Sequence, residues 1–318
     1  MIETRFTKLV GATAPIQVAS MPGISTAELV AAAADAGAVG MIGAPLLSAD
    51  DLESELAWVA KATSGVFGVN FLMPFLDPAC VAVAARGARI VEFFYGDPQR
   101  ALVDEVHAFG ALASWQVGSL DEALAAERAG CDFVVAQGTE AGGHVRGQSS
   151  LLPFLSEVLD ALGVPVLAAG GIATARDLAA VLACGASGAR IGTRFAACAE
   201  SGAHPSYVKA LLAATAADTC LTEVFSDLWP NAPHRVLRSA VAAAQRAPDG
   251  VAGEIRRGSR AIPIARFSAI APTATTTGNV EAMALYAGEG VTHVTSVQPA
   301  AQIIAELVAG AERLRASR

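Results

Sequence analysis

Eight short apolar segments, each followed by a loop and an Ala- and Leu-rich segment, occupy the first 192 residues of the chain. Short apolar segments bounded by glycine, proline or charged residues are typical of buried strands. Strands that alternate with helices pair in parallel, because a parallel return needs a crossover connection. Eight such units predict an α/β fold whose sheet closes into a (β/α)8 TIM barrel. The expected strands are residues 15–19, 38–42, 66–70, 88–93, 111–116, 132–136, 164–168 and 187–192.

Polar residues at the expected helix starts support this pattern. A serine or threonine followed three residues later by an acid can form a capping box, which satisfies free N–H groups of the first turn. An aspartate before a proline places an N-cap ahead of a first-turn proline. The G-x-G-x-x-G fingerprint of a doubly wound dinucleotide-binding fold is absent after the first strand. The expected capping residues are Ser25, Ser48, Asp77, Asp97, Ser119 and Thr174.

The alternating pattern ends after the eighth strand. Between residues 206 and 280 we expect a smaller, mostly helical lobe, with helices over residues 206–217 and 235–246. A last helix over residues 299–315 carries apolar side chains at helical spacing and should pack back on the barrel. We therefore expect residues 1–205 and 281–318 to form the barrel, and residues 206–280 to form a small inserted domain that covers the site.

Composition limits the partners of the chain. With 318 residues, of which 53% are hydrophobic, the chain can bury a large core. A net charge of -8 gives no basic surface for nucleic acid, so a small molecule is the expected ligand. We expect no signal peptide and no membrane span. Five widely spaced cysteines without a C-x-x-C pair suit a reducing cytoplasm, and a homo-oligomer stays an open alternative.

The loops after the seventh and eighth expected strands have the pattern of a phosphate site. In TIM barrels the site lies at the carboxyl ends of the strands, and these two loops often hold phosphate. Strand seven leads into Gly170, Gly171 and Ile172, just before a helix whose positive end would face an anion. Strand eight leads into Gly192 and Thr193, whose hydroxyl can bond a phosphate oxygen. A tight turn explains either glycine segment alone, but the two together favour phosphate.

Residues at other strand ends suit a bound ring system. Side-chain amides offer both donors and acceptors, which a heterocycle with polar edges requires. Each of these residues taken alone fits a satisfied core position. The candidates are the amides of Asn70, Gln116 and Gln137 and, after the first strand, Ala19, Ser20 and Met21.

A glycine-rich segment after the sixth expected strand, residues 137–144, ends in His144. Gly142 and Gly143 let the backbone approach a flat or phosphorylated ligand closely. A histidine on such a loop can take a proton from a bound substrate near neutral pH, although by itself it fits a loop residue that only bonds backbone. Glu140 and His144 have the spacing of a metal pair, but the glycines between them disfavour a helix, so we predict no metal.

These segments together resemble the nitronate monooxygenase family, formerly called 2-nitropropane dioxygenases. The resemblance rests on residues 19–23, 116–119, 137–144, 169–172 and 192–195, covers nearly the whole chain, and is most specific at 137–144. It implies an FMN-binding barrel with a small extra domain. By resemblance, the FMN phosphate would be held by Gly170, Gly171, Gly192 and Thr193, and the flavin would be lined by Ala19, Met21, Asn70, Gln116 and Gly143.

The resemblance also implies a reaction. His144 would remove the α-proton of a neutral nitroalkane or orient an anionic nitronate. Reduced flavin would then pass electrons to dioxygen, and a carbonyl compound and nitrite would leave. The chain departs from the family pattern at residues 20–22 and at Glu289, where a glutamine is expected. If Glu289 lies near the flavin, its charge would act against an anionic substrate.

Two other functions stay open. The same barrel and histidine occur in FMN-dependent reductases of quinones and enoyl thioesters that use NADH or NADPH. A reductase of carrier-bound substrates should present basic residues around its mouth, and the barrel loops carry only Arg146 and Arg194. A flavin-binding protein without catalysis would not need a base at His144. Trp229 and His234 could wall the substrate pocket, although packing of the lobe explains them better.

Overall fold

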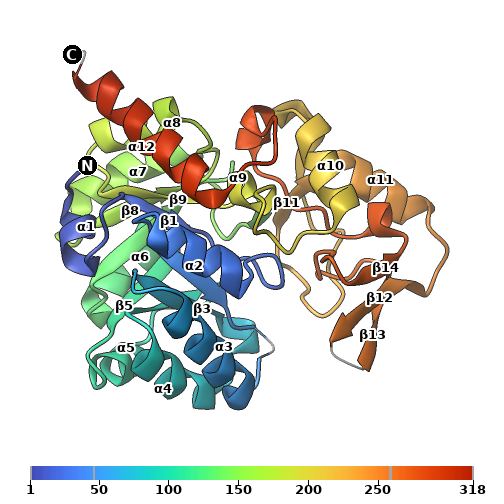
Figure 1. Cartoon of the computed structure of the whole chain (residues 1–318), viewed down its shortest axis with the longest axis horizontal. Coiled ribbons are helices and arrows are strands. Elements are labelled where there is room, and N and C mark those ends of the chain that lie inside the picture. The colour runs from blue at the N-terminus through green and yellow to red at the C-terminus, as the bar shows by residue number, and fades with distance from the viewer. Residues whose placement is uncertain (1, 46, 258–259, 317–318) are drawn as a thin grey trace.

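A closed parallel barrel forms the first part of the molecule in a computed structural model, which describes residues 2–45, 47–257 and 260–316 (Figure 1). The eight strands follow the order β1-β9-β8-β6-β5-β4-β3-β2. The two edges meet because the Val18 N–H donates to the Val39 carbonyl oxygen, and the Val39 N–H donates to that of Ile16, each at 2.9 Å. All eight expected strands are confirmed within two residues at each end. They are β1 (Ile16–Val18), β2 (Gly40–Gly43), β3 (Phe67–Leu72), β4 (Ile90–Phe94), β5 (Leu112–Val117), β6 (Phe133–Gln137), β8 (Val166–Ala169) and β9 (Gly188–Ile191).

Helices cover the outside of this barrel (Figure 1). The closing helix α12 (Ala300–Ala316) packs against α8 and α2, as expected for a last helix that returns to the barrel. A Cβ on Gly310 would lie 2.4 Å from the Cβ of Ala175, so glycine permits this close approach. No helix in the described part of the chain combines the length and apolarity needed to cross a bilayer. The other barrel helices are α1 (Arg5–Val10), α2 (Ala27–Asp35), α3 (Ala49–Ala62), α4 (Pro78–Gly87), α5 (Arg100–His107), α6 (Leu120–Ala129), α7 (Leu151–Ala161) and α8 (Ala175–Ala183).

Most expected helix starts are confirmed, and two are wrong. Ser48, Asp77, Ser119 and Thr174 all accept a hydrogen bond from the first turn of the helix they cap. The cap of α2 is Thr26, one residue later than expected. Helix α5 begins at Arg100 behind Gln99. The capping residue expected there, Asp97, lies two residues before this cap position and pairs with Arg146, so it cannot reach the first turn of α5.

The lobe after β9 is not mostly helical. Both expected helices are present, but the first ends at Ala213 and the second begins at Arg238, after a strand that occupies its expected first residues. Its five strands, together with β7 of the barrel, form two three-stranded sheets, β10-β11-β7 and β13-β12-β14. Sequence periodicity does not reveal these strands because several are very short. Figure 1 shows this lobe beside the barrel. Its elements are α9 (Thr193–Ala196), α10 (Pro205–Ala213), β10 (Thr219–Thr222), β11 (His234–Leu237), α11 (Arg238–Arg246), β12 (Val251–Arg257), β13 (Arg260–Ala265) and β14 (Thr276–Gly278), with β7 (Gly143–His144) supplied by the barrel.

The inside of the barrel has an apolar floor. Helix α1 closes the amino-terminal end, where Phe6 packs edge-on against Phe133 with ring centroids 5.2 Å apart. Met41, Ile90 and Leu167 belong to the same cluster, and all are buried. Burial of such side chains stabilises the barrel by roughly 1.5–3 kcal/mol each. The polar side chains of the interior therefore lie nearer the carboxyl ends of the strands, where the site is expected.

Candidate functional site

Glycine-bearing loops meet beyond the carboxyl ends of β6, β8 and β9. A Cβ on Gly142 would lie 2.4 Å from the backbone N of Gly288 and 3.1 Å from Oγ1 of Thr193. The Gly288 N–H donates to the same Thr193 hydroxyl at 3.0 Å. Gly170 has a φ of 124°, and its Cβ would lie 3.2 Å from the N of Ala141. Three residues predicted from separate loops are thus in one cluster, and glycine is required where the backbones touch.

The first turn of α8 differs from the expected phosphate site. The Asp177 carboxylate accepts hydrogen bonds from the N–H groups of Ala173 and Thr174, at 3.0 and 2.8 Å. The side chain of Ile172 is 7% exposed and belongs to the hydrophobic core. A phosphate here would therefore depend on the backbone of Gly170 and Gly171, since the protein's own carboxylate occupies the helix end.

The end of β1 lies beside the end of β9. A Cβ on Gly192 would be 3.4 Å from the Cβ of Ala19 and 3.9 Å from the sulfur of Met21. The Ser25 hydroxyl fixes this turn, because it donates to the Ala19 carbonyl and accepts from the Met21 N–H, each at 3.0 Å. Ser25 was expected to cap α2, and it holds the candidate ring-binding turn instead.

A buried carboxylate joins five strands inside the barrel. Glu92, in the middle of β4, is 0% exposed and forms an ion pair with Arg190 of β9. It also accepts hydrogen bonds from Asn70 at 2.9 Å and from Gln17 and Ser114 at 3.2 Å each. Sequence reasoning missed Glu92 and Arg190. The available signal was a charged residue within the apolar run of an expected strand, where an unpaired charge would be very costly.

This network reaches the candidate site through Asn70. Its amide oxygen accepts a hydrogen bond from the Ser20 hydroxyl at 2.9 Å, so two predicted site residues from β1 and β3 are connected. Gln116 is buried at 4% exposure on β5, in register with Val135 of β6. Gln116 lies two residues after Ser114 and so points to the same side of β5, the inner side on which Asn70 and Ser114 bond Glu92.

Gln137 and His144 each carry a buried polar atom without a partner. The Gln137 amide N–H donates to the His144 carbonyl oxygen at 3.0 Å, which ties the end of β6 to β7. Gln137 Oε1 and His144 Nε2 are buried and form no hydrogen bond. Buried polar groups are normally satisfied, so these two atoms are suited to receive a ligand. Glu140, between them in the chain, accepts from the Leu151 N–H at 2.9 Å and so faces α7.

Aromatic rings surround the His144 imidazole. Trp229 stacks on it with centroids 3.8 Å apart and planes at 22°. His234, Tyr286 and Tyr95 lie at 5.2, 5.6 and 5.9 Å. Tyr95 follows β4 with a φ of 65°, which is strained for a residue with a side chain. Of these rings, sequence reasoning considered Trp229 and His234 and favoured simple packing of the lobe.

The environment keeps His144 neutral. Burial, and secondarily the neighbouring His234, lowers the pKa of His144 from 6.5 to about 3. His234 is fixed by two hydrogen bonds, because its Nε2 accepts from the Phe225 N–H at 3.2 Å and its Nδ1 lies 2.8 Å from the Ala232 carbonyl oxygen. Burial also lowers the pKa of His234. His234 is therefore a packed structural residue, while the Nε2 atom of the neutral His144 forms no hydrogen bond.

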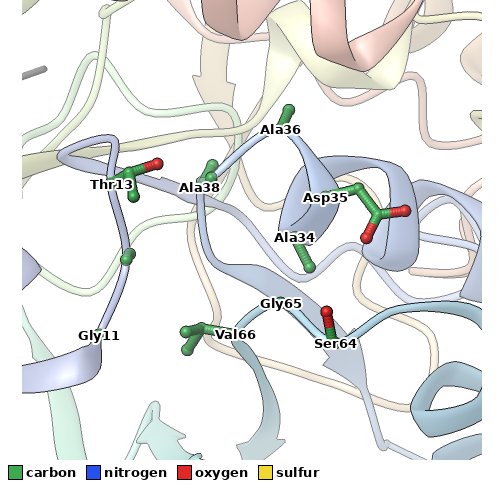
Figure 2. A pocket seen from close by; sticks show the side chains of 11 residues that line it. Gly11, Thr13, Ala34, Asp35, Ala36, Ala38, Ser64, Gly65 and Val66 are labelled. Carbon is green, nitrogen blue, oxygen red and sulfur yellow. The ribbon is translucent and has the colours of Figure 1, made fainter.

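A pocket of about 320 Å³ lies at the opposite end of the barrel. Figure 2 shows its lining by Thr13, Asp35, Ser64 and Val66, on the segments that precede β1, β2 and β3. These segments are at the amino-terminal ends of the strands, whereas catalytic groups in this type of barrel lie at the carboxyl ends. The pocket is therefore separate from the cluster around His144.

Comparison with known proteins agrees with this geometry. The sequence model of the nitronate monooxygenase family matches residues 3–86 and 78–310. The chain belongs to this family. A probable nitronate monooxygenase of Staphylococcus saprophyticus is 32% identical in an alignment over 273 residues, and the match covers 71% of this chain and 77% of the relative. A probable nitronate monooxygenase of Staphylococcus aureus strain Newman is 29% identical in an alignment over 273 residues, and the match covers 70% of this chain and 76% of the relative.

Two solved structures share the fold of this protein over nearly the whole chain. FabK from Thermotoga maritima superposes with a TM-score of 0.81 at 27% identity and covers 100% of both chains. A nitroalkane oxidase from Streptomyces ansochromogenes has the same TM-score at 29% identity, over 99% of both chains. These neighbours are TIM-barrel flavoenzymes, and this family member is likewise a flavin oxidoreductase.

Proposed function

We propose that this enzyme uses FMN and dioxygen to oxidise nitroalkanes or their nitronates to a carbonyl compound and nitrite, with His144 as the base. The observation that carries the proposal is the His144 imidazole, which is neutral at neutral pH and has an unpartnered Nε2. The neutral form is the one that can accept the α-proton of a nitroalkane. Membership of the nitronate monooxygenase family supports the same reaction.

The residues around His144 suit a flavin nucleotide. We assign the phosphate end to Gly142, Gly170, Gly171, Gly192 and Thr193. Close contacts between loops disfavour a side chain at Gly142, and positive φ angles disfavour one at Gly170 and Gly171. We assign the ring to Ala19, Ser20, Met21, Asn70, Gln116, Gln137 and Gly143. The orphaned Gln137 Oε1 supports this placement, because the N–H edge of a flavin would satisfy it. When bound, FMN would accept electrons from the substrate and pass them to dioxygen.

The charge of Glu289 does not oppose this reaction. Glu289 pairs with Arg235 at 3.1 Å, and the Arg235 Nε also donates to the Thr139 carbonyl oxygen at 2.9 Å. The carboxylate is thus compensated beside the glycine-rich loop. An anionic nitronate near His144 would meet a neutral pair, which removes the main objection raised by the sequence.

An FMN-dependent NAD(P)H reductase of quinones or enoyl thioesters is the second candidate. Its support is FabK, which matches this structure as well as the nitroalkane oxidase does. The two basic residues on the barrel loops have internal partners. Arg146 pairs with Asp97 and Glu122, and Arg194 bonds Gln298. An acidic carrier protein would find little free positive charge in either residue, so we favour a small substrate.

The test compares wild type with His144→Asn after both are loaded with FMN. We expect the variant to keep its flavin absorbance and to lose about 100-fold or more of kcat/KM for a neutral nitroalkane, because general-base catalysis contributes at least this much. The loss for a preformed nitronate should be smaller, since its proton is already gone.

Anaerobic spectra separate the two candidate functions. Loss of the oxidised flavin spectrum on addition of nitronate, but not of NADH or NADPH, supports the proposal. Reduction by pyridine nucleotide alone favours the reductase. A protein that takes up no FMN would contradict both.

A further inference from the structure

The inserted lobe contacts His144 through both its backbone and its side chain. Strand β11 pairs antiparallel with β7, with His234 opposite His144 and Arg235 opposite Gly143. The Val145 N–H extends this pairing and donates to the Pro233 carbonyl oxygen at 2.8 Å. Trp229, four residues before this contact, supplies the ring that stacks on the imidazole. The lobe thus fixes the position of the histidine backbone and the plane of its ring separately.

Trp229 lies in a cage built largely from barrel loops. Its indole is 6% exposed and packs edge-on against Tyr95 at 4.7 Å and Phe75 at 5.1 Å. The preceding residue, Leu228, is 68% exposed. Trp229 therefore orients this segment of the chain, because Leu228 contributes little buried surface.

The backbone around Trp229 is strained. Leu228 and Asn231 have φ values of 69° and 55°, in the left-handed region that a leucine rarely adopts. The segment is held by hydrogen bonds from the Asp227 N–H to the Phe267 carbonyl oxygen and from the Trp229 N–H to that of Ser226, each at 3.0 Å. Strained residues persist where surrounding contacts determine the conformation, and they concentrate at functional sites.

We propose that Trp229 is a positioning residue: its indole holds the His144 ring in the plane that presents Nε2 to the substrate. This inference rests on the proposed role of His144 as the base. An imidazole has a broad torsional minimum about its last bond, so a stacked ring restricts an orientation that the backbone alone leaves free. Stacking on the indole therefore determines where Nε2 points, because no hydrogen bond to this atom orients the ring.

Three ionisable groups face the His144 imidazole. His234, Tyr95 and Tyr286 face it from β11, from the loop after β4 and from the segment before Gly288, and His234 also acts on the pKa of His144. Arg146, Glu122 and Glu223 act on Tyr95, and Glu223 also acts on His234. Loss of the indole would admit water to His144 and raise its pKa from about 3 toward 6.5.

The experiment uses the FMN-loaded protein and the variants Trp229→Phe, Trp229→Leu and Leu228→Ala. The phenylalanine can still stack, the leucine is apolar but smaller than the indole and cannot stack, and Leu228→Ala alters the same segment at an exposed side chain. We would follow the His144 ring nitrogens by NMR from pH 4 to 8 and measure kcat and KM for a neutral nitroalkane. Because aromatic stacking has a modest energy, we expect Trp229→Leu to lower kcat about tenfold.

Trp229→Leu should also bring the His144 midpoint into the measured range, with little change in KM. Trp229→Phe and Leu228→Ala should resemble wild type in both readouts. An unchanged His144 titration and kcat in Trp229→Leu would overturn the inference, as would equal losses in the leucine and phenylalanine variants. A shifted titration in Trp229→Leu, together with full activity of His144→Asn, would support positioning of the ring and refute its role as the base.

Discussion

At the scale of single residues, the neutral state of His144 has a consequence for stability. Its folded pKa of about 3 lies below the ordinary value of 6.5, so protonation favours the unfolded chain. The contribution of His144 to the free energy of unfolding should therefore be at its full value above pH 6.5, and the free energy should fall as the pH drops toward 3. This residue alone should account for a loss of about 2 kcal/mol between pH 7.5 and pH 5.

Urea unfolding at both pH values checks this effect. The variant His144→Asn cannot gain this proton, so its unfolding free energy should change less than that of wild type over the same interval. His234 remains in both proteins and cancels in the comparison. Equal pH dependence of the two proteins would mean that His144 is protonated as readily when folded as when unfolded.

A second residue-scale prediction concerns Gly143. Gly143 and Gly110 have similar φ values of 81° and 78°, and a Cβ on either would meet no atom within 4 Å. Alanine at either position should cost roughly 1 kcal/mol of stability through the backbone alone. Only Gly143 borders the proposed flavin site, so Gly143→Ala should weaken FMN binding about tenfold or more, while Gly110→Ala should not. Fluorescence titration of the flavin and thermal unfolding measure both effects, and equal FMN affinities would place the flavin away from Gly143.

At the scale of elements, the neighbouring hydroxyls of Ser25 and Thr26 at the start of α2 form different hydrogen bonds. Thr26 accepts from the Leu29 N–H at 3.0 Å and donates to the Glu200 carbonyl oxygen at 2.8 Å, while Ser25 holds the turn of Ala19 and Met21. We expect Thr26→Ala to lower stability by about 1 kcal/mol, as for loss of an N-cap, with FMN affinity unchanged.

The matched change Ser25→Ala should raise the FMN dissociation constant, because the turn after β1 loses its fixed geometry. Thermal unfolding and flavin titration of both variants check the pair. If Thr26→Ala weakened FMN binding more than Ser25→Ala, the helix start and not the turn would be the supporting element.

At the scale of the whole molecule, the Glu92–Arg190 pair connects opposite sides of the barrel interior. Glu92→Gln leaves the Arg190 guanidinium buried without its counter-charge. Such a change typically destabilises a protein by roughly 3–5 kcal/mol. The double variant Glu92→Leu with Arg190→Leu removes both charges but leaves Asn70, Gln17 and Ser114 without their shared acceptor, so it should recover only part of this loss.

Urea unfolding of the single and double variants measures the coupling between the two charges. If the single variant were as stable as wild type, the pair would not be a structural part of the barrel. If the double variant recovered stability but still bound FMN weakly, the Asn70–Ser20 branch of the network would be the part that serves the flavin site.

The barrel, and the end of the barrel at which the candidate site lies, could be predicted from local patterns in the amino-acid sequence. Strand period, helix caps and parallel crossovers are local or near-neighbour properties, so the eight strands follow from short stretches of chain. The glycines and amides at strand ends could be assigned for the same reason, because the carboxyl ends of parallel strands share one face. The strand pairing of the inserted lobe could not be predicted, since β7 has only two residues and its partner β11 lies far along the chain.

The protonation state of His144, the proposed base, depends on contacts between distant segments of the chain. His144 is neutral because His234 and aromatic residues from distant segments bury it, and Trp229 fixes its plane from the lobe. The ion pair between Glu92 and Arg190 forms because β4 and β9 face each other across the barrel, so it could not be predicted from either strand alone. Burial and pairing depend on which distant side chains meet, and no local pattern in the sequence records that.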